Sequence, residues 1–310
     1  MDTLPNTRER RWSSHGWNNR LSLFLIRSIT PRLPSAVLPA VHGLMTGICY
    51  AAMPRERRAS LANLERVCGR DGTRLRRRSL ALFYNFSRFM VSRLDLARLS
   101  AEDLARRVVN LDEARAALTA VLREGNGAIA ATAHLGNWEI GARLLCLTGR
   151  RVHVVMMADG DDVVEHEYQR LRAVDGVQTH WVGGSDFLAV DLLSALRRGE
   201  LVALQADRDT GSWRVKLPLF GAPVWLPLGP ASLARASGAS ILPCFVLMES
   251  GNDLRLHIGE PIRVARGLDA TQDLREATRR LARAIEAAVS ERPDQWFNFY
   301  PIWDPEKSPA

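Results

Sequence analysis

From residue 125 onward, short apolar runs alternate with longer runs of helical periodicity, and this alternation constrains the fold more than any other feature of the chain. Apolar runs typical of buried strands occupy residues 127–133, 152–157, 177–182, 201–206, 241–247 and 254–258. Runs with a helical apolar period occupy residues 138–148, 163–173, 186–198, 229–237 and 272–290. Strands separated by helices predict an α/β fold with a mainly parallel central sheet flanked by helices.

The residues before this alternation predict a helical N-terminal region. Helical periods cover residues 55–64, 74–94, 101–109 and 111–124. Asp71-Gly72 marks a turn, and the aromatic stripe from Leu80 to Met90 is more typical of core than of a ligand groove. We therefore expect one large domain over residues 55–310, helical over 55–124 and with its sheet core over 125–303, whose aromatic segment 295–303 is packed.

Residues 1–54 form a basic and apolar segment that we expect to be helical and to associate with a membrane. Residues 33–54 contain no Asp, Glu, Lys or Arg, a length that suits a membrane span, but prolines, glycines and a histidine interrupt them. Residues 21–29 are apolar around one arginine, and residues 1–20 lack the apolar core of a signal peptide. Residues 21–54 are interpreted as helices on or dipping into a bilayer; a buried helix pair is an equal alternative, and a true span is disfavoured.

The positive charge of the chain is concentrated in its first third. Residues 1–110 carry a net charge of +12 and residues 111–310 a net charge of −4, which gives +8 for the 310 residues. Such asymmetry predicts an anionic partner: a membrane surface, a nucleic acid or an acidic carrier protein. No helix-turn-helix, zinc-finger or RNA-binding signature is present, so nucleic acid is not expected as a partner.

The sequence His134-Leu135-Gly136-Asn137-Trp138-Glu139 lies where an apolar strand gives way to a helix. His134 then stands at the carboxyl end of a strand, where open α/β sheets bind ligands. Asn137 suits a helix N-cap, and Glu139 in the first turn could orient the His134 ring as a base. With no enzyme nucleophile in the motif, the base would take its proton from a substrate hydroxyl, which describes direct group transfer. The spacing alone is common by chance, so a surface histidine beside a capping glutamate stays open.

A second polar cluster follows the strand at 201–206. This strand ends in Gln205, Asp207, Arg208 and Asp209, again at the edge of the sheet where ligands bind. Arg208 could bind a phosphate or stabilise charge on a carbonyl oxygen, with Asp207 holding its guanidinium. An Arg–Asp pair that merely ties down a loop is the alternative.

Four separated blocks together resemble a known family. They are HLGNWE at 134–139, DRD at 207–209, PLFGAP at 218–223 and LPLGPASLARASGASILP at 226–243. In this order they resemble the bacterial lipid A biosynthesis acyltransferase family, part of the lysophospholipid acyltransferase superfamily, over roughly residues 55–303. The Asp-Arg-Asp block also resembles the branch that acylates phosphatidylinositol mannosides.

The resemblance implies transfer of a fatty acyl chain from an acyl carrier protein or coenzyme A thioester to a hydroxyl of a membrane glycolipid, with lipid A as the default acceptor. It implies no metal and no cofactor, and a location on the cytoplasmic face of a bacterial inner membrane, peripheral or monotopic. The catalytic residues would be His134, Glu139 and Arg208. Residues expected to bind substrate are Asn137, Asp207, Asp209, Phe220, Gly221 and Gly229. An acyl-thioester hydrolase and a non-catalytic membrane-surface adaptor remain as alternatives of another class.

Overall fold

The computed structural model of the chain describes residues 33–34, 36–92, 98–157, 176–185, 187–209, 211 and 213–303. Its centre is a six-stranded sheet in the order β3-β2-β4-β1-β7-β8. Its strands are β1 (Ala128–Thr132), β2 (Val152–Met156), β3 (Val177–Trp181), β4 (Leu201–Gln205), β7 (Ser240–Met248) and β8 (Leu254–Ile258). All pairs are parallel except β7 with β8. The predicted α/β class, the mainly parallel sheet and all six predicted strands are confirmed.

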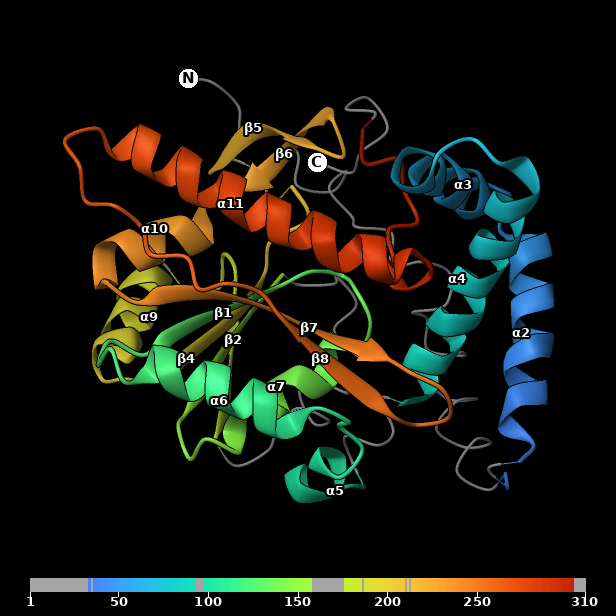
Figure 1. Cartoon of the computed structure of the whole chain (residues 1–310), viewed down its shortest axis with the longest axis horizontal. Helices are drawn as coiled ribbons and strands as arrows, with labels where there is room; N and C mark the ends of the chain where they lie inside the picture. Colours follow the sequence, from blue (N-terminus) through green and yellow to red (C-terminus); the bar gives the residue numbers. More distant parts are fainter. Residues whose placement is uncertain are drawn as a thin grey trace.

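Helices cover both faces of this sheet (Figure 1). One face packs against α9 (Leu188–Arg197), α10 (Gly229–Ser237) and α11 (Ala270–Glu291). The other face packs against α6 (Leu111–Leu122) and α7 (Trp138–Cys146). The predicted helices at these five places are confirmed to within a few residues at their ends, whereas the helix expected at 163–173 lies outside the described residues.

A two-stranded antiparallel hairpin, β5 (Arg214–Leu219) with β6 (Ala222–Pro227), was not predicted from the sequence. Proline is disfavoured in the interior of a sheet, but a two-stranded ribbon exposes its edges, where proline is tolerated. Alternate residues point into the core that contains α11, among them Leu217, Leu219, Val224 and Leu226.

The N-terminal region is helical, as predicted, with α2 (Leu38–Ala52), α3 (Pro54–Cys68), α4 (Gly72–Ser92) and α5 (Ala101–Ala105). The aromatic stripe on α4 belongs to the core, because Phe83, Phe86 and Phe89 are buried against the C-terminal Phe297 and Phe299. Segment 295–303 is therefore packed, as expected.

Helix α2 lies at the edge of the molecule and packs along α4 (Figure 1), where His42 Nδ1 and Ser87 Oγ are 3.0 Å apart. No helix among the described residues is both long and apolar enough to cross a bilayer. The apolar run predicted at 21–29 lies outside the described residues, so only the second half of the 21–54 segment is seen.

Candidate active site

The register of the central strands brings the two polar blocks of the sequence together. Strands β1 and β4 are parallel neighbours in which Thr132 pairs with Gln205. Two residues beyond this pair, on the same face of each chain, stand His134 and Asp207. The strand order, which the sequence alone does not give, makes neighbours of residues 73 positions apart.

His134 and Asp207 form a hydrogen-bonded pair. The His134 Nδ1 lies 2.8 Å from Oδ1 of Asp207, and the His134 backbone N–H donates to Oδ2 of the same carboxylate at 3.1 Å. The Asp207 side chain is fully buried, while 15% of the His134 side chain is exposed. The carboxylate thus fixes both the position and the rotation of the imidazole ring.

The charges around this pair define its protonation state. Burial alone would raise the pKa of Asp207, but His134, Arg208 and the Trp296 indole together lower it below its ordinary value, so the carboxylate is ionised. Burial, followed by the charge of Arg208, lowers the pKa of His134 from 6.5 to about 4, although Asp207 and Glu139 oppose this. His134 is therefore neutral at pH 7. Because its Nδ1–H donates to Asp207, the basic nitrogen of the neutral ring is Nε2.

The C-terminal segment holds Asp207 in place. The Trp296 Nε1–H and the Asn298 Nδ2–H donate to Asp207 Oδ2 at 2.9 and 3.2 Å. Asn298 Oδ1 accepts from Arg208 Nε at 2.6 Å, and the backbone carbonyl of Phe297 accepts from Arg208 Nη2 at 2.7 Å. Arg208 is only 8% exposed and lies over the Tyr300 ring. Its guanidinium is thus engaged with the C-terminal segment, an arrangement that sequence reasoning missed.

The turn after His134 requires its glycine. Gly136 has φ 64°, and a Cβ built there would come within 2.0 Å of the Val246 carbonyl oxygen. The next residue, Asn137, donates its backbone N–H to that same oxygen at 2.7 Å. The His134 carbonyl accepts from the Phe297 backbone N–H at 2.8 Å. The chain that follows His134 is thereby fixed to β7 and to the C-terminal segment.

Asn137 is the N-cap residue of α7, as predicted, but its side chain does not cap the helix. Its Nδ2 donates instead to Ser92 Oγ at 2.7 Å, which ties the turn to α4. Glu139 is in the first helical turn, as predicted, is only 8% exposed and raises the pKa of His134 through its charge. The partner at His134 Nδ1 is nevertheless Asp207, so the orienting role that the motif suggested for Glu139 stays a prediction.

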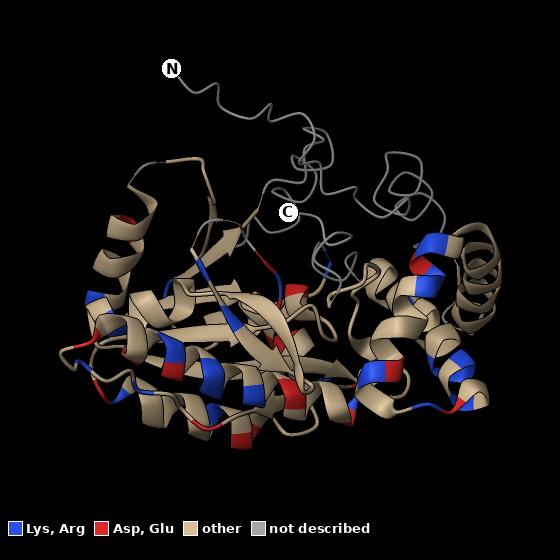
Figure 2. Ribbon diagram, turned by 90° about the horizontal axis from the view of Figure 1, so that it is seen from above, with Lys and Arg blue, Asp and Glu red and all other residues tan. Residues whose placement is uncertain are grey.

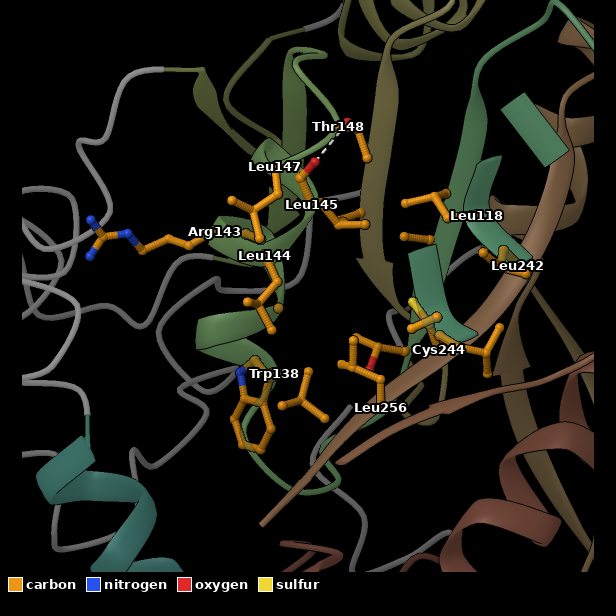
Figure 3. A pocket seen from close by; sticks show the side chains of 18 of the residues that line it. Leu118, Trp138, Arg143, Leu144, Leu145, Leu147, Thr148, Leu242, Cys244 and Leu256 are labelled. Atoms are coloured by element: carbon orange, nitrogen blue, oxygen red, sulfur yellow. Dashed lines mark hydrogen bonds between the residues drawn. The ribbon is translucent and has the colours of Figure 1, made fainter. Parts of the chain in front are cut away.

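An apolar cavity of about 510 Å³ lies between the sheet and helices α6 and α7. Figure 3 shows Leu118, Leu145, Leu242, Cys244 and Leu256 converging on it from α6, α7, β7 and β8. Most of its wall is aliphatic, which suits a hydrocarbon chain better than a polar ligand.

The cavity adjoins the histidine. Its wall includes Ala130 and Thr132 of β1, and the next residue of that row is His134. It also includes Trp138, whose ring centroid is 5.3 Å from that of His134. Glu139 contributes to the same wall. The arrangement therefore places a neutral base beside a cavity able to hold an apolar chain.

The remaining predicted substrate-binding residues occupy the hairpin side of the molecule. Asp209 forms an ion pair with Arg214 at the start of β5. Phe220 and Gly221 form the hairpin turn, where the Phe220 N–H donates to Glu286 and its ring packs beside Trp296. Gly229 is the first residue of α10. These contacts show how the four residues are held in the fold, and their roles in substrate binding stay predictions.

Among the described residues, no group of three or more His, Cys, Asp or Glu side chains is arranged to hold a metal ion. The residues that sequence reasoning missed at the site are Trp296 and Asn298. The only sequence signal for them was the aromatic composition of the tail, because their polar atoms reach Asp207 only once α11 has brought the tail back to the sheet.

The sequence of the chain is similar to those of known proteins. Residues 17–304 match the family described as bacterial lipid A biosynthesis acyltransferase. A phosphatidylinositol mannoside acyltransferase of Mycobacterium tuberculosis is 29% identical over 208 residues, which cover 66% of this chain and 62% of that protein. The protein of the same name from Mycolicibacterium smegmatis is 27% identical over 279 residues, which cover 87% of this chain and 86% of that protein.

Proposed function

Because the chain belongs to the bacterial lipid A biosynthesis acyltransferase family, we propose that it is an O-acyltransferase that moves a fatty acyl chain from a thioester to a hydroxyl of a membrane glycolipid. The observation that carries the proposal is the neutral His134, held by Asp207, beside an apolar cavity. A base without an enzyme nucleophile suits direct attack by an acceptor hydroxyl on the thioester.

The proposed reaction uses His134 twice. Its Nε2 takes the proton of the acceptor hydroxyl as the oxygen attacks the thioester carbonyl carbon, and the resulting imidazolium later protonates the departing thiolate. Asp207 stabilises the imidazolium, as the buried aspartate does in a serine-protease triad. The buried charge of Glu139 favours the same protonated state. Arg208, engaged with Asn298 and Phe297, would act by keeping Asp207 ionised.

The cavity is the proposed site of the acyl chain. Leu118 and Leu242 represent its aliphatic wall, and burial of each methylene of a chain there contributes about 0.8 kcal/mol. An acyl carrier protein or coenzyme A would bring the thioester to the His134 end of the cavity. No metal or cofactor has a part in this proposal.

The acceptor is proposed to be a glycolipid. The relatives support a phosphatidylinositol mannoside, because two proteins with that activity in their names align with 66% and 87% of this chain. The family description supports lipid A as a second candidate. Both acceptors offer a hydroxyl at a membrane surface, which is the shared requirement of the site.

The proposed location is the cytoplasmic face of a bacterial inner membrane, with peripheral or monotopic attachment. Helix α2 has no charged residue and stands at the edge of the molecule (Figure 2). On its outer side Leu44 is 66% exposed and Ile48 is 52% exposed. An exposed aliphatic stripe next to basic helices suits the interface of an anionic bilayer.

The test is mass spectrometry of membrane lipids from a deletion strain complemented with the wild type or with His134→Ala. We expect a glycolipid to lose one acyl chain on deletion and only the wild type to restore it. Free fatty acid released from a thioester by the purified protein, with no acylated lipid, would favour a hydrolase. Restoration by His134→Ala would refute the proposal in favour of a non-catalytic adaptor.

A further inference from the structure

Gln205 is the last residue of β4 and contributes to the wall of the cavity. It pairs with Thr132 of β1 and precedes Asp207 by two residues, about 6.6 Å along an extended chain. Because side chains two apart on an extended chain share a face, Gln205 and Asp207 belong to the same row. Gln205 is thus the nearest residue of β4 to the His134–Asp207 pair on the cavity side of the strand.

The Gln205 Nε2 is buried and has no hydrogen-bond partner among the described residues. Leaving such a donor unsatisfied is costly, and buried polar groups in folded proteins are nearly always paired. The residues before and after Gln205 in the chain, Leu204 and Ala206, are apolar. An aliphatic side chain at position 205 would avoid the penalty of an unsatisfied donor. A donor kept without a partner in the wall of a ligand cavity points to an acceptor on the ligand.

The chemistry of an acyl thioester indicates which atom of the ligand accepts the hydrogen bond from Gln205. This step rests on the proposed function. The hydrocarbon chain of an acyl thioester has no hydrogen-bonding group, whereas its carbonyl oxygen is a good acceptor. The carbonyl carbon must lie within reach of a hydroxyl that hydrogen-bonds to His134, which places the carbonyl at the end of the cavity where Gln205 stands. Arg208 is already engaged with Asn298 and Phe297.

We infer that Gln205 is a catalytic residue, whose side-chain amide donates a hydrogen bond to the thioester carbonyl oxygen and stabilises the oxyanion that forms there. The acceptor oxygen bonds to the carbonyl carbon as its proton passes to His134 Nε2, and the C=O π electrons move to the carbonyl oxygen beside Gln205. When they return, the C–S bond breaks, and the thiolate takes the proton from His134. A donor aimed at developing charge favours the transition state over the bound substrate.

The test compares Gln205→Leu and Gln205→Glu with Gln178→Leu in the full-length protein. Gln178 is an exposed glutamine on β3 outside the cavity wall. Gln178→Leu therefore makes the same chemical change as Gln205→Leu at a position away from the proposed site. Turnover is measured with palmitoyl-coenzyme A and a mannosylated phosphatidylinositol acceptor, or lipid A precursor if that is the lipid found, and Tm is measured alongside.

We expect Gln205→Leu and Gln205→Glu to lower kcat by roughly 10²–10³-fold, with KM for the thioester changed less than threefold. The Tm of Gln205→Leu should equal or exceed that of the wild type, because the variant removes an unsatisfied buried donor. Gln178→Leu should keep wild-type turnover.

Two results would overturn this inference. One is a kcat for Gln205→Leu within threefold of the wild type; the other is a loss that comes with a lower Tm and a raised KM, which indicates a packing role. If His134→Ala is inactive while Gln205→Leu is fully active, only the role of Gln205 fails. If His134→Ala is itself active, the proposed function fails.

Discussion

The two faces of the central sheet are formed by the same strands but differ in packing: one face is buried in a continuous core, and the other lines a cavity. On the face toward α9, α10 and α11, residues such as Ile129, Ala131 and Val202 are fully buried in a continuous core. On the face toward α6 and α7, the alternate residues Ala130 and Ala203 contribute to an open cavity. Because successive residues of a strand point to opposite faces, one face can provide stability while the other leaves room for a ligand.

The difference extends beyond the ends of the strands. On the packed face the rows of β1 and β4 continue into Ala133 and Ala206, which are buried in the core. On the cavity face the same strands continue into His134 and Asp207. The site therefore results from the pairing register of β1 with β4 and from the alternation of side chains along each strand. Together they place the His134–Asp207 pair on the same face as the apolar cavity.

The largest expected effect is at the polar pair. Asp207 Oδ2 accepts three donors, so in Asp207→Asn the carbonyl oxygen stays there and the amide NH₂ faces His134 Nδ1. The ring must then carry its proton on Nε2, where the base is needed, and kcat should fall roughly 10²–10⁴-fold. Steady-state transfer assays measure this, with Asp112→Asn on the exposed side of α6 as control. Wild-type turnover by Asp207→Asn would show that the Asp207 carboxylate is not needed for acyl transfer.

A matched pair of substitutions on β1 tests the two faces directly. Ala131→Leu adds volume to the packed face and should lower the free energy of unfolding by about 1–3 kcal/mol or more. Ala130→Leu projects into the cavity and should cost less than about 1 kcal/mol while shifting the preference toward shorter acyl thioesters. Urea unfolding and turnover with a chain-length series measure both. Equal destabilisation with unchanged chain preference would contradict the distinction between the faces.

The pH dependence of turnover tests the state of His134. Because its pKa is lowered from 6.5 to about 4, the base stays neutral well below pH 6, and kcat/KM should fall to half only near pH 4. Between these values the unfolded chain binds a proton at this residue that the folded protein does not, so stability should also decline as the pH falls from about 6.5 to about 4. A kcat/KM midpoint near 6.5, with the fold intact by circular dichroism, would contradict the lowered pKa.

The smallest expected effect is at the membrane surface. Leu44→Glu on α2 should weaken binding to vesicles of phosphatidylglycerol and phosphatidylethanolamine several-fold and change stability by less than about 0.5 kcal/mol. Val190→Glu on α9, at a side chain 60% exposed, is the control and should bind as the wild type does. Cosedimentation measures both. An unchanged affinity of Leu44→Glu would remove α2 from the membrane contact.

The sequence predicted the fold well where periodicity determines structure. The six strands of the central sheet follow from short continuous apolar runs, and the helices around them follow from apolar periods of 3.6 residues. The hairpin β5–β6 escaped prediction because Pro218 and Pro223 argue against strands in a sheet interior, which this ribbon does not occupy.

The site was predicted only in part, since local pattern places His134 and Asp207 at strand ends but does not say which strands are neighbours. The strand order pairs these residues, and the returning C-terminal segment adds Trp296 and Asn298. Both are long-range features. Asp207, the Nδ1 partner of His134, therefore lies 73 positions away in the sequence, beyond the range of a local motif, while the orienting role of Glu139 stays a prediction.

The most direct test of the central claim is transfer by the purified protein with His134 replaced by alanine. Labelled acyl chain is followed from palmitoyl-coenzyme A into glycolipid, and circular dichroism confirms the fold. We predict that His134→Ala folds like the wild type and transfers at least about 10³-fold more slowly, because the base at the cavity is gone. Transfer at the wild-type rate would contradict it.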